Sequence, residues 1–140
     1  MSSFTSPLVV SVMLDGKYWR LERPFTYHIG SKHSRAYIRV PRLFLTDWAS
    51  IPKFIFGLLP YWAKYCKAPV LHDWLYQKKG IMGKPITRKR ADDIFLEAML
   101  VEWRWHKSRH IMAYIEYWGV RLFGCLAWHK VNPNLLPERT

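Results

Sequence analysis

Cysteine is scarce in this sequence, and that excludes two common ways of stabilising a small domain. The 140 residues include only Cys66 and Cys125, with no Cys-x-x-Cys pair. A disulfide scaffold or a structural zinc site would need more thiols at closer spacing. Because both cysteines lie in apolar stretches, we expect two buried free thiols. The N-terminus also lacks a basic segment and a small-residue cleavage site, so we expect no signal peptide.

Acidic residues are also few, which leaves the chain strongly basic. Ten Asp and Glu face 22 Lys and Arg, for a formal net charge of +12. Such a balance predicts an anionic partner: nucleic acid, an acidic protein or a negatively charged membrane. Eight Trp and eight Tyr suit a membrane interface, and they equally suit stacking on single-stranded nucleic acid. Composition does not separate the two.

Long apolar runs are almost absent. The one stretch that needs testing against a membrane span is 111–128, eighteen residues in which only Glu116 and Arg121 are charged. Eighteen residues is the short limit for crossing a bilayer, and each central charge costs roughly 3 kcal/mol. We expect a buried or interfacial helix and no transmembrane span.

Length and composition indicate one domain over residues 1–140. Half of the residues are apolar, and there is no repeat or low-complexity segment. Residues 1–40 read mainly as strands, 41–130 mainly as helices, and 131–140 as a loose tail. The predicted fold class is therefore α+β, with an N-terminal antiparallel sheet followed by a helical half.

The strand half is predicted from alternation and turn residues. Asp15-Gly16 separates two strand-like runs, Leu8–Leu14 and Lys17–Leu21, which is a strong hairpin pattern. After Pro24 breaks the pattern, Phe25–Ile29 and Ala36–Val40 supply two more strands.

The helical half is predicted from caps and helical spacing. Pro69 suits the first turn of a helix that runs to about Gln77. Thr87 is a natural N-cap for a helix of roughly five turns that reaches Trp105. Ser108 is expected to cap the last helix, whose apolar residues share one face: Ile111, Ile115, Trp118 and Leu122.

The segment Leu71–Met99 carries the residues best suited to chemistry. His72 and Tyr76 are four apart and share a helix face, with Asp73 beside them. Two helices joined by a short loop pack antiparallel, which brings Asp92 or Asp93 near His72. A His oriented by a carboxylate is a general base, and Asp73 could then hold a hard cation. The alternative is a salt bridge or a satisfied core pair.

The order His72-Asp73-x-x-Tyr76, then Ala91-Asp92, resembles the catalytic helices of phospholipase A2, closest to the compact type in parvovirus capsid proteins. The resemblance implies that His72 activates water and that Asp92 orients it. It also implies that Tyr76 bonds to Asp92 and that Asp73 binds calcium, which would polarise the ester carbonyl. Where those enzymes have a glycine-rich calcium loop, this chain has only Gly57.

The whole chain also resembles a phage and bacterial family of unknown function, DUF1353. The matching segments are Thr46–Pro52, His72–Tyr76 and Ala91–Phe95. The resemblance implies a phage or prophage origin, hence a location in the virion or the host cytoplasm, and it supplies no activity. Asp47 could join Asp73 as a metal ligand and Ser50 could support the pocket. Alternatively, both simply cap a turn before Pro52.

Six basic residues surround the loop after the His72 helix and could form an anionic-surface-binding patch or a solvated face. They are Lys78, Lys79, Lys84, Arg88, Lys89 and Arg90.

Two functional hypotheses follow. The first is a phage-encoded, phospholipase A2-like lipid ester hydrolase at anionic membranes, with catalytic His72, Asp92 and Tyr76, supporting Asp93, and calcium as the metal. The second is a non-enzymatic virion or assembly protein that keeps the helix pair structurally. Nucleic-acid binding ranks third.

Overall fold

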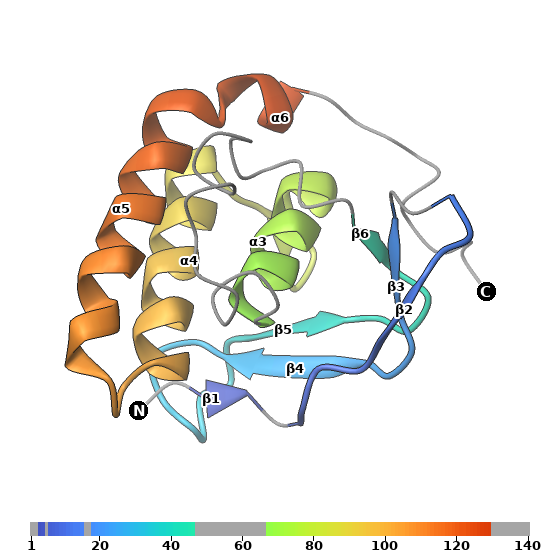
Figure 1. Ribbon diagram of the computed structural model, residues 1–140, viewed down its shortest axis with the longest axis horizontal. Coiled ribbons are helices and arrows are strands. Elements are labelled where there is room, and N and C mark those ends of the chain that lie inside the picture. Colours follow the sequence, from blue (N-terminus) through green and yellow to red (C-terminus); the bar gives the residue numbers. More distant parts are fainter. Residues whose placement is uncertain (1–2, 5, 16–17, 47–66, 130–140) are drawn as a thin grey trace.

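The computed structural model describes residues 3–4, 6–15, 18–46 and 67–129. Strands come first and helices follow, as the α+β prediction requires (Figure 1). The strands are β1 (Ser3–Phe4), β2 (Val10–Val12), β3 (Trp19–Leu21), β4 (Phe25–His28), β5 (Tyr37–Val40), β6 (Leu45–Thr46), β7 (Gly80–Ile81) and β8 (Lys84–Pro85). The helices are α3 (Lys67–Lys78), α4 (Arg88–Glu102), α5 (Lys107–Phe123) and α6 (Cys125–His129).

The strands of the N-terminal half form two small antiparallel sheets, ordered β1-β4-β5 and β2-β3-β6. The predicted hairpin is present, with Val10 opposite Leu21 and Val12 opposite Trp19. Asp15 accepts a hydrogen bond from the Tyr18 N–H through Oδ1 at 3.2 Å, while Gly16 lies outside the described residues. The two strands predicted after Pro24 are also present as β4 and β5, which pair antiparallel.

Residues after 40 are predicted to be mainly helical, but this part of the chain also contains the short strand β6 and the β7–β8 hairpin. β6 pairs with β3, and β7 pairs with β8 as a small hairpin between α3 and α4. Each of these strands has two residues, too few to show an alternating pattern. The hairpin turns through left-handed backbone at Met82 (φ 51°) and Gly83 (φ 79°), and glycine adopts that conformation without strain.

The caps of the long helices are partly as predicted. Thr87 caps α4, since its Oγ1 accepts a hydrogen bond from the Arg90 N–H at 3.1 Å. α4 ends at Glu102, about a turn earlier than expected. The prediction that Ser108 caps α5 is wrong, because α5 begins at Lys107 with His106 as its N-cap. A hydrogen bond from the His106 N–H to the Trp103 carbonyl tightens the turn before α5 and moves the start upstream.

Two acidic side chains of α4 join this helix to the strand half and to the start of α3. Glu97 accepts hydrogen bonds from the Tyr27 hydroxyl at 2.7 Å and the Gly30 N–H at 3.0 Å, which attaches α4 to the β4 strand and its following turn. Glu102 accepts from the Lys67 and Ala68 N–H groups at the start of α3. A carboxylate there is stabilised by the positive end of the helix. α4 is thus the central connector of the described fold.

The core lies where α3 and α4 meet the strands. Ala68 lies near Glu102 and Tyr76 lies near Asp92, so α3 and α4 run antiparallel, as the short connection predicts. Fully buried side chains come from both halves of the chain, among them Leu21, Tyr27, Val40, Leu71, Leu75, Ile94 and Phe95.

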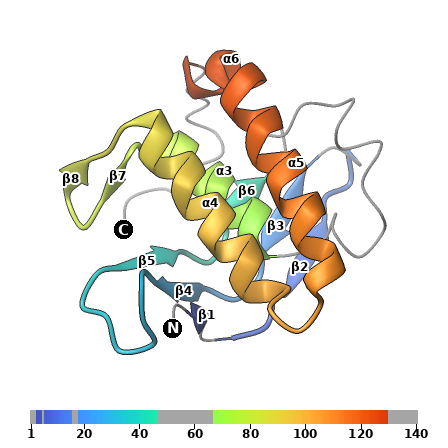
Figure 2. The same ribbon diagram turned by 90° about the vertical axis from the view of Figure 1, so that its left-hand side faces the viewer.

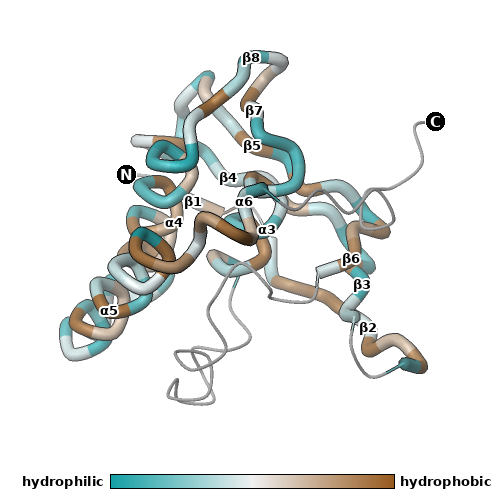
Figure 3. Tube along the Cα trace, turned by 90° about the horizontal axis from the view of Figure 1, so that it is seen from above, coloured by the Kyte–Doolittle hydropathy of each residue, from teal (hydrophilic) through white to brown (hydrophobic). Residues whose placement is uncertain are grey.

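α5 turns its apolar stripe outward. Ile111 is 69% exposed, Trp118 58% and Leu122 69%, while Glu116 on the opposite face is fully buried. Cys125 is exposed, so the prediction that it is buried is wrong, because α6 turns it away from the core; Cys66 lies outside the described residues. Figure 3 shows hydrophobic residues recurring along α5 and α6. No helix in the described ranges is long and apolar enough to cross a membrane.

Candidate active site

Asp92 connects the facing surfaces of α3 and α4. Its Oδ1 lies 2.7 Å from His72 Nε2 and accepts a hydrogen bond from the Tyr76 hydroxyl at 2.6 Å. This is the proximity that the two-helix spacing predicts. All three side chains are buried, and α3 supplies two of them because residues four apart share a face. We call His72, Tyr76 and Asp92 the His-Asp-Tyr cluster.

The second oxygen of Asp92 faces two arginines. Arg121 Nη1 donates to Oδ2 at 2.8 Å, and Arg88 Nη1 lies 3.5 Å from the same oxygen. Arg88 also donates to the Val120 and Arg121 carbonyls at the C-terminal end of α5. Cations are favoured at that end of a helix. The two guanidinium groups therefore compensate the buried carboxylate and attach α5 to it.

The electrostatics of the cluster favour a neutral imidazole beside an ionised carboxylate. Burial lowers the pKa of His72, although the bond to Asp92 opposes that shift. For Asp92, burial alone raises the pKa, but bonds from His72, Tyr76 and Arg121 outweigh it and hold the pKa below its ordinary value. Since Asp92 then accepts, Nε2 of His72 carries the proton, and the basic nitrogen is Nδ1.

Aromatic packing fixes the imidazole ring. The ring of Phe95 stacks on His72 with centroids 4.4 Å apart, and the Tyr76 ring lies 4.2 Å away on a tilt of 48°. Gly124 closes over Tyr76, because a Cβ at this glycine would meet the Tyr76 hydroxyl at 2.6 Å. These contacts hold the imidazole ring of His72 in one orientation.

Asp73 points away from the cluster toward the strands. Its Oδ2 accepts a hydrogen bond from the Thr46 hydroxyl at 2.6 Å, and its side chain is 1% exposed. Calcium takes six to eight oxygen ligands. In the described part of the chain, no three His, Cys, Asp or Glu side chains are grouped to hold a metal. Those residues do not assemble a calcium site at Asp73.

Comparison with known proteins identifies the family. The family model described as "Protein of unknown function (DUF1353)" matches residues 19–119, which include the entire segment from β3 through most of α5. The chain belongs to this family. No curated protein and no solved structure matches it. The family description carries no activity, and it neither supports nor opposes the phospholipase A2 resemblance.

In the DUF1353 chain, Asp93 does not share the role of Asp92. Its Oδ2 lies 2.6 Å from Lys89 Nζ, and its Oδ1 accepts from the Tyr117 hydroxyl at 2.7 Å. It therefore stabilises the packing of α4 on α5 and does not contact His72. Asp47 and Ser50, predicted to complete the pocket, lie outside the described residues.

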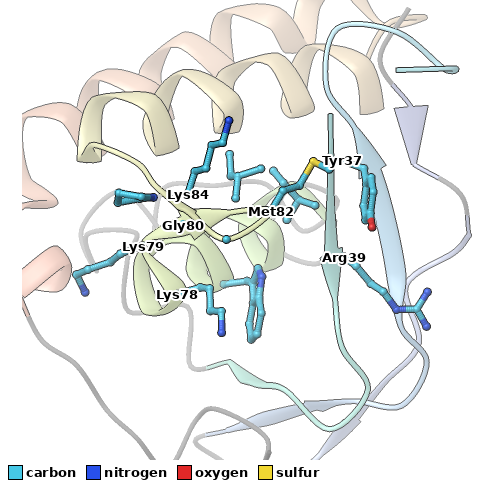
Figure 4. Close-up of a pocket in the computed structure, with 12 residues that line it drawn as sticks. Tyr37, Arg39, Lys78, Lys79, Gly80, Met82 and Lys84 are labelled. Carbon is cyan, nitrogen blue, oxygen red and sulfur yellow. The ribbon is translucent and has the colours of Figure 1, made fainter. Parts of the chain in front are cut away.

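Three members of the predicted basic patch form hydrogen bonds or ion pairs with other described residues. Arg88 bonds to Asp92, and Lys89 bonds to Asp93. Lys79 donates to the Tyr76 carbonyl and lies 5.0 Å over the Trp128 ring. Lys78, Lys79 and Lys84 line a groove of about 710 Å³ beside the β7–β8 hairpin (Figure 4). Arg90 lies outside that groove.

Sequence reasoning missed three contributors to the DUF1353 site: Thr46, Arg121 and the internal role of Arg88. Thr46 forms its hydrogen bond across 27 positions of sequence, and Arg121 reaches Asp92 across 29. One local signal existed, because Arg88 and Asp92 are four apart on one helix face.

Proposed function

We propose that this protein is a phage-encoded, phospholipase A2-like hydrolase that cleaves lipid esters at anionic membranes. The observation that supports this most is the double hydrogen bonding of one Asp92 oxygen by His72 Nε2 and the Tyr76 hydroxyl. That arrangement fixes the imidazole tautomer that general-base chemistry needs.

The proposed reaction uses His72 Nδ1 as the base. It takes a proton from water, whose oxygen bonds to the ester carbonyl carbon. When the carbon–oxygen bond to the alcohol breaks, the imidazolium returns that proton to the leaving oxygen, which gives a fatty acid and an alcohol. Asp92 stabilises the transient imidazolium through Nε2. Since burial keeps the pKa of His72 low, the base is unprotonated at neutral pH.

The outward stripe of α5 and α6 supplies the proposed membrane contact. It carries large exposed side chains, and the one acidic residue on these two helices, Glu116, is buried. Lys107 adds an exposed positive charge at the start of α5. Arg121 and Gly124 bring the far end of the stripe against the His-Asp-Tyr cluster. Charge and aromatic composition favour an anionic lipid surface. The residues are Ile111, Tyr114, Ile115, Trp118, Leu122 and Leu126.

The test is fatty-acid release from phosphatidylglycerol vesicles, with phosphatidylcholine vesicles for comparison. Wild type should act faster on the anionic vesicles. His72→Ala should abolish release, and Asp92→Asn should lower it by at least tenfold. Asp93→Asn is the matched control, because that neighbouring carboxylate contacts Lys89 and Tyr117 instead of His72, and it should retain near wild-type activity.

Calcium is a separate variable in the same assay. The phospholipase resemblance predicts that chelation stops the reaction and that Asp73→Ala has the same effect. If wild type releases no fatty acid with or without millimolar calcium, the hydrolase proposal is wrong for these lipids.

A second candidate is the non-enzymatic virion or assembly protein. The specific observation in its favour is burial: His72 and Asp92 are 0% exposed and Asp73 is 1% exposed. A buried pair that loses one partner typically costs 3–5 kcal/mol. If wild type is inactive and His72→Ala and Asp92→Asn both melt far below Asp93→Asn, the cluster is a structural network.

A further inference from the structure

A groove separate from the His-Asp-Tyr cluster lies between the β7–β8 hairpin and strand β5. It has a volume of about 710 Å³, within the range of ligand sites in proteins. Tyr37, Ile38 and Arg39 come from β5, the edge strand of its sheet, while Trp74 and Lys78 come from α3. The hairpin forms the other side (Figure 4). Nothing in the sequence predicted that β5 and this hairpin would meet.

The charge of the groove is of one sign. Arg39, Lys78, Lys79 and Lys84 line it, and no acidic residue does. Lys79 is held by the Tyr76 carbonyl and the Trp128 ring. The other three form no ion pair with any residue in the described ranges. Three uncompensated cations around one concave surface are suited to the phosphates of a ligand.

The rest of the lining is aromatic and apolar. Tyr37 is 43% exposed and Met82 57%, and Trp74 is partly buried against the core, with Lys78 Nζ 6.0 Å from its ring centre. Flat rings beside cations are the usual means by which proteins hold unpaired bases while phosphates stay at the rim. An acidic peptide would use the cations and leave the rings without a role.

A membrane is the other anionic surface to consider, and the location of the groove disfavours it. The β7–β8 hairpin and helix α5 lie apart from each other in the molecule, as Figures 2 and 3 agree. A flat bilayer that contacts the stripe would leave the groove facing water. A concave surface also matches a strand better than it matches a planar layer of headgroups.

We propose that this groove binds single-stranded nucleic acid, with phosphates at Arg39, Lys78 and Lys84 and bases against Tyr37 and Trp74. The contact is to the backbone and to ring faces, so it favours no particular sequence. This inference is independent of the hydrolase proposal, because it involves neither His72 nor Asp92.

The test is fluorescence anisotropy with a labelled ten-nucleotide oligo-dT over a range of salt concentrations. Three phosphate contacts predict that log K falls against log salt with a slope of about −2, since single strands release roughly 0.7 counterion per contact. Lys78→Gln and Lys84→Gln should each reduce the slope by about 0.7. Tyr37→Leu should weaken binding about tenfold and leave the slope unchanged.

Matched controls separate the groove from general positive charge. Lys107→Gln removes the same charge on α5, away from the groove, and should change the slope little. Lys78→Arg and Lys84→Arg should keep binding, and melting curves should show that every variant is folded. The inference is overturned if Lys107→Gln weakens binding as much as the groove variants do. It is also overturned if the groove variants reduce binding to phosphatidylglycerol vesicles or polyglutamate and not to oligo-dT.

Discussion

Glu116 is an acidic residue in an environment that disfavours its charged form. It lies fully buried on α5, and neither carboxyl oxygen has a hydrogen-bond partner among the described residues. Burial, with a smaller effect from Glu102, raises the pKa of Glu116 to about 8. A carboxyl group with a raised pKa is protonated in the folded protein at neutral pH and ionised in the unfolded chain.

The raised pKa gives Glu116 a definite effect on stability. The folded state holds the proton more tightly, so the chain is most stable below pH 4.5 with respect to this group, and stability falls as pH rises toward 8. At pH 8, Glu116→Gln should therefore have a free energy of unfolding higher than that of wild type by on the order of 3 kcal/mol. Its urea unfolding midpoint should be correspondingly higher. Near pH 4.5 the two should unfold at nearly the same concentration. Equal urea midpoints at both pH values would contradict a buried, protonated Glu116.

The His-Asp-Tyr cluster has the opposite pH dependence. The pKa values of His72 and Asp92 are both lowered, so their contribution is present at neutral pH and is lost on acidification. The loss begins as pH falls below the ordinary His range and continues below that of Asp. In the Glu116→Gln background, which removes the opposing carboxyl group, the protein should thus melt at lower temperature at pH 4 than at pH 7. Asp92→Asn removes the bond that raises the pKa of His72, so in the same background its melting temperature should fall at least as much between pH 7 and pH 4.

At the scale of elements, α4 connects the two halves of the chain. Glu97 reaches Tyr27 and Gly30 in the strand half, so this one side chain holds the helix to the sheet. Glu97→Ala should lower the free energy of unfolding by about 1–3 kcal/mol, because a buried hydroxyl loses its acceptor. Glu97→Gln keeps an acceptor oxygen and should lose less. Urea unfolding of both variants measures the difference, and an equal loss would assign the effect to packing instead.

The secondary-structure elements show which features of the fold can be predicted from local sequence patterns. The β2–β3 hairpin, the start of α4 and the approach of His72 to Asp92 followed from local spacing, because each depends on residues close in sequence or on one helix pair. The β6 strand, the bond from Thr46 to Asp73 and the bond from Arg121 to Asp92 did not, since each depends on how distant elements meet. The outward face of α5 shows a further limit: spacing reveals that a stripe exists and not which way it turns.

At the scale of the whole molecule, the described acidic residues are used internally. Each one either accepts a hydrogen bond from the chain or is buried: Asp15, Glu22, Asp73, Asp92, Asp93, Glu97, Glu102 and Glu116. The net charge of +12 is therefore carried by a surface with few free carboxylates. Attraction to polyanions should be strong and should weaken steeply with salt.

The outward stripe of α5 gives a whole-molecule prediction for lipid binding. Trp118→Ser should weaken sedimentation with phosphatidylglycerol vesicles about tenfold or more, because a large apolar side chain gains roughly 1.5–3 kcal/mol on leaving water. Tyr37→Ser is the matched control: it removes an exposed aromatic ring from strand β5 and should bind vesicles like wild type. If Trp118→Ser instead alters the sedimentation coefficient without lipid, the stripe joins two copies of the chain.

The position of α4 in the chain also determines when its contacts with the strands can form during translation. Glu97 bonds to residues 67 and 70 positions earlier, and Glu102 bonds to the start of α3 34 positions earlier. On a ribosome, the first sheet emerges long before the helix that holds it. Contacts of such long range are formed late, after a large loss of chain entropy. The strands of the N-terminal half therefore lack their contacts with α4 until about two thirds of the chain has been synthesised. A chaperone that binds nascent chains would have its largest effect during this interval.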